Sequence, residues 1–594
     1  MGWPYHFVTL TPAQIEERRK LLDQAGYYAY LTPVIVLASI YILRQLFFSQ
    51  PNKVAVPTGK PQVPGLLTVQ KRRLTWWLNE PLTPEFGARK VHFIGLGYAA
   101  FLLFLVFRKT GDDYLHLTKR FGHVAASQLP FHYMMAIKSP LSPIQIATGL
   151  TWEKMNDYHR LFGRIVHLMV ATHATMYLNF FIQAGLLSKR FGDWDVRTGF
   201  LAFIMFNILA GFSVPGVRKG NYHQKFFRSH AVQSGLVPIV LFFHVAYIRK
   251  YVVQAFILYV FNAMTRGQNS SGETLSTVTT LEGTSVSSAL LKLRIPTPLV
   301  GGRPLTWVPG QHIYVKRSIA PTAPRNPFTI VSLPPEQHVA GGTPYVDIVI
   351  RNRGGPGTRW LEAKHHQIKA DDRQEFVMIE GPYGEAKEYM PPLLDSNEGA
   401  GKILCVAGGI GATYTIPIYL SLLRKRKSTV GVHFVWFVHS VQDAAWGIPL
   451  LNAAKTDVDV RIYLTRDIDK SLLVSGKAGL GELKSGIKIL NYGKRPPMKD
   501  IMDRYFAPAT TVAGAMLTTG TRGKDYTPVT VLVCGPPTMN DAVRKEVGKH
   551  VMDYGRDVMM YEERFGHGAA LEADVIEETF RQKGLRKVLL AQSL

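Results

Sequence analysis

The chain has 594 residues, which is enough for two to four domains. Its formal net charge of +26 is not accompanied by a basic-aromatic repeat or another nucleic-acid motif, so a nucleic-acid partner is not expected. The two cysteines, Cys405 and Cys534, exclude a disulfide framework and a zinc-finger class, and they suit a reducing compartment. Charged residues at 16–20 precede any apolar run, so no secretory signal is expected.

Long apolar runs fill the first part of the chain, up to about residue 265. Several of these runs are near or below the roughly 20 residues that cross a bilayer, so a helical bundle with polar ligands inside explains them better than isolated spans. Residues 1–90 are expected to form an extension with one span and a basic loop, and residues 91–265 a transmembrane bundle. The seven candidate spans are 28–48, 91–107, 121–137, 159–183, 198–214, 230–248 and 250–264.

The second part of the chain is typical of soluble β and α/β domains. Residues 266–290 are rich in Ser, Thr and Gly, which indicates a linker whose second half is compatible with a strand. Alternating strands and turns predict a small β-barrel within 266–390, and alternating strands and helices predict a parallel sheet within 391–567. Residues 494–527 resemble an aperiodic insertion, and 568–594 form a tail with amphipathic helical character.

Four histidines carry the clearest pattern of the apolar part. His159 and His173 are 14 residues apart, and so are His230 and His244. That spacing is about 21 Å along a helix, with a rotation that returns to within roughly 40° of its start. Two such helices side by side offer two bis-histidine sites stacked across a bilayer. Neutral imidazole is a good axial ligand of haem iron, and ionisable groups inside spans tend to be functional.

Other residues near the four histidines have weaker cases. A lone histidine of this kind is more often a core residue, and only the duplicated spacing favours ligation. His167 lies about 80° off the shared face and His223 precedes its span, so neither is expected to be a ligand. Arg160, Arg164 and Arg228 match haem propionates as well as they match a plain position at the membrane surface.

A flavin-type pattern follows in the predicted barrel. A strand that ends in Pro-aromatic-Thr can place a ring and a hydroxyl against an isoalloxazine, and a guanidinium with Gly-Thr backbone amides suits a pyrophosphate. The Pro-Phe-Thr run alone is a weak indication, but the segment 381–384 (GPYG) closes the same barrel. The candidate FAD-binding residues are His312, Asn326, Pro327, Phe328, Thr329, Arg351, Gly357 and Thr358.

Two loops of the predicted parallel sheet indicate a dinucleotide site. The segment 406–413 (VAGGIGAT) follows a strand and precedes an apolar helix, where glycine amides and the helix N-terminus favour a diphosphate. A tight strand–helix turn explains this loop alone, but a second loop, 534–537 (CGPP), follows another strand about 125 residues later. The first loop provides the candidate diphosphate-binding residues Gly408, Gly409, Gly411 and Thr413.

The segments HRLFGRIVHLMVATH and FFRSHAVQSGLVPIVLFFH resemble the haem helices of fungal ferric-chelate reductases, which belong to the superfamily that includes the NADPH oxidases. The resemblance covers roughly residues 90–567. It implies a transmembrane haem bundle, a ferredoxin-reductase-type antiparallel β-barrel FAD domain and an α/β Rossmann-like NADP-binding domain. It also implies that His159 and His230 bind a cytosolic-side haem b, and that His173 and His244 bind an outer one.

The resemblance extends to the end of the soluble part. Residues 561–565 resemble the closing segment of the family, in which Phe565 would cover the flavin ring; a buried core position is the alternative for this residue. In the family the two Gly-rich loops flank the nicotinamide, so the resemblance implies that Cys534, Gly535 and Pro536 bind NADP, together with His439 and Arg466. Phe565 and Cys534 are therefore the expected catalytic residues beside the flavin and nicotinamide. Asn326 stands where the family has His, and His439 where it commonly has Arg. Arg466 offers a second positive charge for a 2′-phosphate, which favours NADPH over NADH.

The implied function is electron transfer from cytosolic NADPH through FAD and two b haems to extracytoplasmic ferric, and also cupric, chelates. An NADPH oxidase that makes superoxide is the alternative enzyme, and a low-turnover haem-binding subunit or redox sensor is the alternative outside catalysis. The expected partners are the lipid bilayer and ferric chelates. The plasma membrane is the expected location, with the vacuole or another endomembrane left open together with the oligomeric state.

Overall fold

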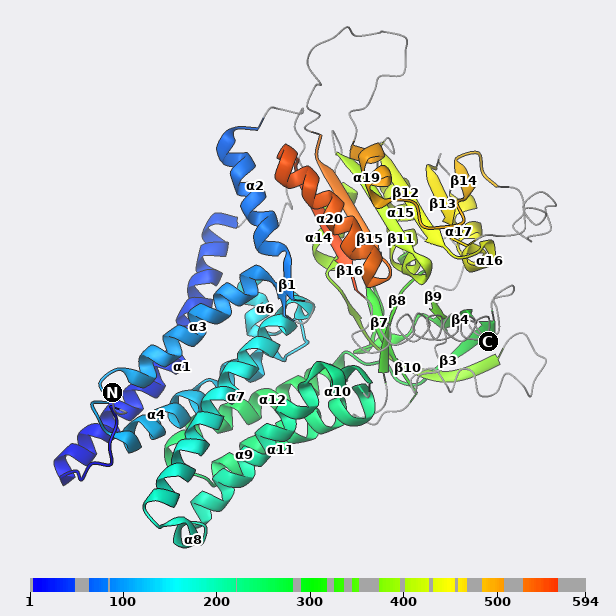
Figure 1. The fold of residues 1–594 in the computed structure, drawn as a ribbon. Coiled ribbons are helices and arrows are strands. Elements are labelled where there is room, and N and C mark those ends of the chain that lie inside the picture. The colour runs from blue at the N-terminus through cyan, green and yellow to red at the C-terminus, as the bar shows by residue number, and fades with distance from the viewer. Residues whose placement is uncertain are drawn as a thin grey trace, which may run out of the picture. The chain divides into compact units, whose positions relative to one another are not determined.

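The computed structural model describes residues 4–48, 64–83, 86–220, 222–280, 290–317, 325–335, 345–351, 373–395, 401–426, 431–454, 458–466, 483–506 and 527–564. The chain forms two compact units, of which one contains residues 1–51 and 78–269 and the other contains residues 52–77 and 270–594 (Figure 1).

The first unit is a bundle of helices. Four of the described helices, α1, α3, α7 and α9, are long and apolar enough to cross a membrane. A short β1–β2 pair, Pro81–Thr83 with Gly87–Ala88, precedes α3. The helices are α1 (Pro12–Phe48), α3 (Arg89–Phe107), α4 (Tyr114–Ser127), α5 (Leu129–Met135), α6 (Pro143–Thr148), α7 (Trp152–Gln183), α8 (Leu187–Arg190), α9 (Trp194–Ser213), α10 (Pro215–Gly220), the π-helix η1 (Tyr222–Phe227), α11 (Arg228–Phe242), the 3₁₀ turn η2 (Ala246–Ile248) and α12 (Arg249–Gln268).

Two predicted spans differ from the observed helices. The span 121–137 is divided at Gln128 between α4 and α5, because Pro130 starts a new helix and cannot donate a backbone hydrogen bond. The span 230–248 was expected to be one helix, but α11 ends at Phe242. The amide of His244 donates to the carbonyl oxygen of Leu241, three residues back, so the last turn is tightened and His244 lies just past the helix.

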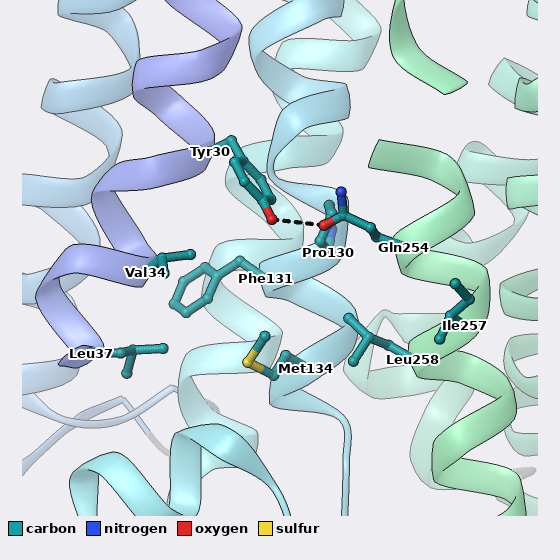
Figure 2. Close-up of a pocket in the computed structure, with 9 residues that line it drawn as sticks. All are labelled: Tyr30, Val34, Leu37, Pro130, Phe131, Met134, Gln254, Ile257 and Leu258. Atoms are coloured by element: carbon teal, nitrogen blue, oxygen red, sulfur yellow. Dashed lines mark hydrogen bonds between the residues drawn. The ribbon is translucent and has the colours of Figure 1, made fainter. Parts of the chain in front are cut away.

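Helix α1 is an integral part of the bundle, although it precedes the residues that carry the resemblance. Ala25 and Ala29 are buried, and the Tyr30 hydroxyl donates to Oε1 of Gln254 on α12 at 2.8 Å. Figure 2 shows this bond at the rim of an apolar pocket between α1, α5 and α12. The pocket is lined by Tyr30, Val34, Leu37, Pro130, Phe131, Met134, Gln254, Ile257 and Leu258.

The second unit starts with an antiparallel barrel in the order β8-β7-β10-β3-β4-β9. A bridge between Ile330 and Ile348 joins the two edge strands and closes the sheet, which confirms the predicted barrel. In the Ser/Thr-rich segment the structure describes one strand across the middle, β3, and residues 281–289 lie outside the described residues. The strands are β3 (Thr274–Thr280), β4 (Leu290–Pro296), β7 (His312–Lys316), β8 (Arg325–Thr329), β9 (Tyr345–Arg351) and β10 (Arg373–Tyr383), with a small β5–β6 pair, Leu299–Val300 and Arg303–Pro304.

A parallel sheet in the order β14-β13-β12-β11-β15-β16 follows and confirms the predicted α/β fold. Alternate residues of β11 face two separate cores, since Cys405 packs with α14–α17 and Leu404 packs with α19 and α20. The elements are α14 (Ala386–Asp395), β11 (Lys402–Gly408), η5 (Gly409–Gly411), α15 (Ala412–Lys425), β12 (Val432–Val438), α16 (Val441–Ala444), α17 (Ile448–Asn452), β13 (Val460–Leu464), β14 (Ile487–Asn491), α19 (Met498–Phe506), β15 (Val529–Cys534), α20 (Pro537–Tyr554) and β16 (Val558–Glu563).

The prediction of an aperiodic insertion over 494–527 was wrong in its first part, where helix α19 forms. Its buried residues, Met498, Ile501, Met502, Tyr505 and Phe506, recur at helical spacing over only nine residues. The short length and the adjoining Pro-rich segment concealed this period. The rest of the expected insertion, residues 507–526, lies outside the described residues.

Helix α2 (Leu66–Asn79) provides the least expected packing, because residues 52–77 group with the soluble half. Trp76 is buried in the core below α20. Arg72 pairs with Asp557 at 2.6 Å and donates to the carbonyl oxygen of Gly555 at 3.2 Å. A segment from between the first two predicted spans therefore belongs to the dinucleotide-type domain.

Candidate haem, flavin and nicotinamide sites

The structure brings the four histidines of the 14-residue pattern together in the predicted pairs. The ring centres of His159 and His230 are 6.2 Å apart, and those of His173 and His244 are 6.5 Å apart. Two metal–nitrogen bonds of about 2 Å each, plus about 1.1 Å from each nitrogen to its ring centre, separate axial imidazoles by about 6 Å. Both ring-centre separations therefore match those of two axial imidazoles on one iron.

We call His159 and His230 the inner pair, and His173 and His244 the outer pair, after the haems they are expected to bind. The outer pair also has the hydrogen bonds that orient metal-binding imidazoles. Nδ1 of His173 lies 2.8 Å from the carbonyl oxygen of Thr118, and Nδ1 of His244 lies 2.7 Å from the carbonyl oxygen of Asp195. A ring that donates from Nδ1 to a carbonyl presents a lone pair at Nε2, which is the nitrogen that binds iron.

Glycines on facing helices make room for these rings. A Cβ at Gly122 would lie 2.6 Å from the His173 ring, and one at Gly199 would lie 2.5 Å from the His244 ring. Arg160 adds a feature of the inner pair, since its Nε and Nη1 are buried without a hydrogen-bond partner in the described structure while Nη2 pairs with Asp157. An unpaired guanidinium edge beside His159 suits a carboxylate such as a haem propionate.

A protein-only metal centre is not indicated in the described ranges, where no group of three or more His, Cys, Asp or Glu side chains is placed to hold an ion. A histidine pair supplies only two ligands, and a porphyrin supplies the other four. The predicted non-ligand His167 takes no part in either pair in the described ring contacts. The side chain of His223 lies outside the described residues.

The flavin candidates lie together on two paired strands of the barrel. Asn326, Pro327 and Phe328 of β8 are half-buried and lie opposite Val315, Tyr314 and Ile313 of β7. The buried Oγ1 of Thr329 has no hydrogen-bond partner in the described structure, so it is available to a polar edge of a bound group. His312 is buried, with Nδ1 at 3.9 Å from Oε1 of Glu563. Gly357 and Thr358 lie outside the described residues.

Arg351 has a protein partner where the sequence predicted a phosphate. Its Nη2 lies 3.1 Å from Oδ1 of Asp443, at the start of α16. Its Nε is buried without a hydrogen-bond partner in the described part of the chain. The ion pair joins the barrel to the parallel sheet and leaves one edge of the guanidinium for a ligand.

Sequence analysis missed a buried charge cluster beside the flavin strands. Glu380 is fully buried and pairs with Lys316 at 2.6 Å and with Arg325 at 3.2 Å. The Tyr383 hydroxyl donates to its other oxygen at 3.1 Å. Two cations around one carboxylate leave positive charge next to β8, which favours an anionic ligand. Arg325, directly before the Asn-Pro-Phe-Thr run, was the available clue.

The two Gly-rich loops of the sheet are in direct contact. A Cβ at Gly411 would lie 2.1 Å from the carbonyl oxygen of Cys534, and one at Gly408 would lie 2.7 Å from the Pro536 ring. These glycines are therefore needed for the approach of the two loops. Gly409 differs, because its φ is +53° and a Cβ there would meet nothing within 4 Å. It faces open space where a phosphate could lie.

The side chains of Cys534 and Thr413 are both buried in this pair of loops. Burial, with Glu563 and Glu562 nearby, raises the pKa of the Cys534 thiol, so the thiol is neutral rather than a nucleophilic thiolate. The Thr413 hydroxyl donates to the carbonyl oxygen of Ile410 at 2.9 Å. Phe565 lies outside the described residues, but β16 pairs Glu563 with Cys534, which brings the chain to within two residues of Phe565 at this loop.

His439 and Arg466 lie at the same edge of the sheet as the Gly-rich loop. His439 directly follows β12 and Arg466 closely follows β13, and the amide of Thr465 donates to the carbonyl oxygen of Val438 at 2.8 Å. Both side chains are exposed. The carboxyl ends of parallel strands are the common ligand-binding edge of such folds, so the adenosine end of a nucleotide would reach both side chains.

Comparisons with known proteins support this division of the chain. Residues 121–243 match the family model "Ferric reductase like transmembrane component", 276–387 match "FAD-binding domain" and 401–548 match "Ferric reductase NAD binding domain". Fold and comparisons define a membrane flavoprotein with a helical transmembrane domain followed by FAD- and NAD-binding domains. The chain belongs to the ferric reductase family, as its resemblance to the fungal members predicted.

The individual relatives are distant. "Ferric reductase transmembrane component 1" of Schizosaccharomyces pombe is 24% identical over 54% of this chain and 59% of its own length. "Probable metalloreductase AIM14" of Scheffersomyces stipitis is 23% identical over 66% of this chain and 68% of its own. "Ferric/cupric reductase transmembrane component 2" of S. pombe is 21% identical over 59% and 66%. The chain thus spans about three fifths to two thirds of the length of these relatives.

Proposed function

We propose that this protein is a ferric-chelate reductase that moves electrons from NADPH across a membrane through FAD and two b haems. The observation that carries the proposal is the approach of two histidine pairs, His159 with His230 and His173 with His244, each at the separation of axial ligands. Three of these residues lie on α7 and α11, and His244 lies just past the end of α11. The names of the relatives, ferric or ferric/cupric reductases and a probable metalloreductase, favour ferric chelates, and also cupric ions, as acceptors.

The residues of this chain would hold and order the redox groups. When bound, FAD accepts a hydride and passes on its electrons singly to haems that each carry one. Thr329 and the Lys316–Arg325 charges bind and orient the flavin, and the contact of the Gly411 and Cys534 loops shapes the nicotinamide pocket. His439 and Arg466 attract the 2′-phosphate, which favours NADPH over NADH. The neutral Cys534 thiol excludes water without competing as a nucleophile.

The direction of transfer follows from the course of the chain. Helix α2 belongs to the unit that contains the dinucleotide-type domain, and α3, the α4–α5 pair, α7, α9, α11 and α12 lie between them. These six passages are an even number, so the start of α3 and the end of α12 both lie on the NADPH side. Helices α7 and α11 then both start on that side, which assigns His159 and His230 to the inner haem and His173 and His244 to the outer one.

The N-terminus supports the same topology. The amide of His6 donates to the carbonyl oxygen of Asp112, and the amide of Tyr114 donates to that of His6. The N-terminal segment thus lies at the turn after α3, which the proposed topology places on the outer face. In the plasma membrane, this face meets extracellular chelates.

Sealed, oriented vesicles test the proposal. A membrane-impermeant ferric chelate should be reduced only from the outer face with NADPH supplied on the other, and at the same rate without oxygen. Superoxide release that replaces ferric reduction would favour an oxidase instead. The sequon at Asn269 should remain unglycosylated, because it follows the last passage on the NADPH side. A glycan there, or reduction only on the NADPH side, would contradict the topology.

A further inference from the structure

A third histidine lies at the inner pair, and the reductase proposal gives it no role. The imidazole of His132, on α5, is stacked on that of His159, with ring centres 4.2 Å apart and an angle of 13° between the planes. Its Nδ1 is buried and has no hydrogen-bond partner in the described structure. A hydrogen bond from Nδ1 therefore does not explain its orientation, whereas the parallel ring contact does.

The inner and outer pairs are oriented by different means. The Nδ1 atoms of His173 and His244 meet backbone carbonyls at 2.8 and 2.7 Å. The Nδ1 atoms of His159 and His230 are buried without hydrogen-bond partners in the described ranges. The Nδ1 atoms of the inner pair thus lack the carbonyl contacts that the outer pair has. His159 instead meets His132 in two ways, through the backbone of His132 and through the parallel ring contact.

The neighbouring helix also reserves room for His132. A Cβ at Gly163, one turn after His159 on α7, would lie 2.8 Å from Cε1 of His132. This is the arrangement that Gly122 and Gly199 give to His173 and His244. His132 therefore packs against a glycine in the same way as the two outer histidines do.

We infer that His132 is a positioning residue for the inner haem, and that its stacked ring fixes the plane of the axial His159 imidazole. This inference rests on the proposed function, because it takes His159 and His230 as the ligands of that haem. The relative planes of two axial imidazoles determine the rhombic splitting of low-spin ferric haem. Loss of the stack should change the spectrum of one haem and leave the number of haems unchanged.

The test compares His132→Leu with His132→Phe in the full-length protein, by haem stoichiometry and low-temperature electron paramagnetic resonance. Leucine removes the flat face, so one of the two low-spin signals should shift or broaden while two haems remain. Phenylalanine keeps a stacking ring and should restore the wild-type signal. Gly163→Ala, which pushes the ring from its seat, should shift the same signal, whereas Gly97→Ala, with nothing within 4 Å of its Cβ, should not.

Two outcomes overturn the inference. Unchanged signals in His132→Leu would show that the stack has no positioning role, and loss of one haem in both His132 variants would make His132 a ligand. His230→Ala separates these from a failure of the reductase proposal, because it should remove only the inner haem. If His230→Ala retained both haems, the ligand assignment itself would be wrong. Flavin content checks that each variant has folded.

Discussion

The proposed haem and nicotinamide sites would recognise their ligands by opposite means. In the bundle, four imidazoles would bind the haem iron, and glycines such as Gly122 make room for the rings. In the parallel sheet, the backbone carries the site, since Gly408 and Gly411 bring two loops into contact and Gly409 opens space for a phosphate. Side-chain substitution should therefore abolish the first site, and added side-chain volume should abolish the second.

The largest expected effect is the loss of an outer ligand. His173→Ala should remove one of two haems, because no other imidazole in the described ring contacts faces His244. Ferric reduction should fall by at least about 100-fold, while NADPH still reduces the flavin at the normal rate. Haem stoichiometry and stopped-flow flavin reduction measure the two parts. His167→Ala is the control, and an unchanged haem content in His173→Ala would refute the assignment.

A larger side chain in the Gly-rich loop tests whether the backbone forms the nicotinamide site. Gly409→Val should slow flavin reduction by NADPH by roughly 10- to 100-fold, because the side chain enters the space of a phosphate and strains a positive φ. Both haems should remain. Gly431→Val is a matched control with a φ of +82°, at the opposite, amino-terminal end of β12. Equal slowing in both variants would indicate backbone strain alone and would reassign the loop.

Substitutions in α2 test whether this helix, which lies between α1 and α3 in the sequence, stabilises the unit that contains residues 270–594. Trp76→Ala should lower the free energy of unfolding of the soluble unit by about 3 kcal/mol, because this side chain is 7% exposed beneath α20. Trp77, at 38% exposure, provides the control, with an effect below about 1 kcal/mol for Trp77→Ala. Release of FAD on heating reports both. Equal stability of the two variants would mean that α2 does not stabilise the unit.

Sequence patterns predicted the features that depend on a regular spacing or on a local run of glycines. The 14-residue histidine spacing predicted two pairs that the structure brings together, and the Gly-rich loop predicted the ligand edge of the sheet. The end of α11 was missed, because the apolar run continues through the turn that the His244 amide closes on Leu241. The contact of the His244 ring with the Asp195 carbonyl of α9 joins residues far apart in the sequence and leaves no local pattern. His132 was missed for a similar reason, since its role depends on a ring contact between α5 and α7.

The soluble half shows the same limit. The ion pair of Glu380 with Arg325 and the docking of α2 on α20 join residues that lie far apart in the sequence. No local period marks either one. Arg351 was predicted as a phosphate ligand from its residue type, and only the folded chain shows that Asp443 already occupies one edge of its guanidinium.

The smallest expected effect concerns cofactor choice. NADPH should be preferred over NADH, and His439→Arg should widen the preference by roughly threefold to tenfold. A guanidinium carries a permanent positive charge and can form two parallel hydrogen bonds to a phosphate, which an imidazole cannot. Initial rates of flavin reduction with both nucleotides measure this.

Arg466→Ala is the companion variant for this prediction. The structure places Arg466 and His439 at the ends of neighbouring strands, so each can reach the same 2′-phosphate. If Arg466 carries most of the recognition, Arg466→Ala should abolish the preference and His439→Arg should partly restore it. An unchanged NADPH/NADH ratio in both variants would place the 2′-phosphate away from this edge, and the sheet would then recognise only the diphosphate that both nucleotides share.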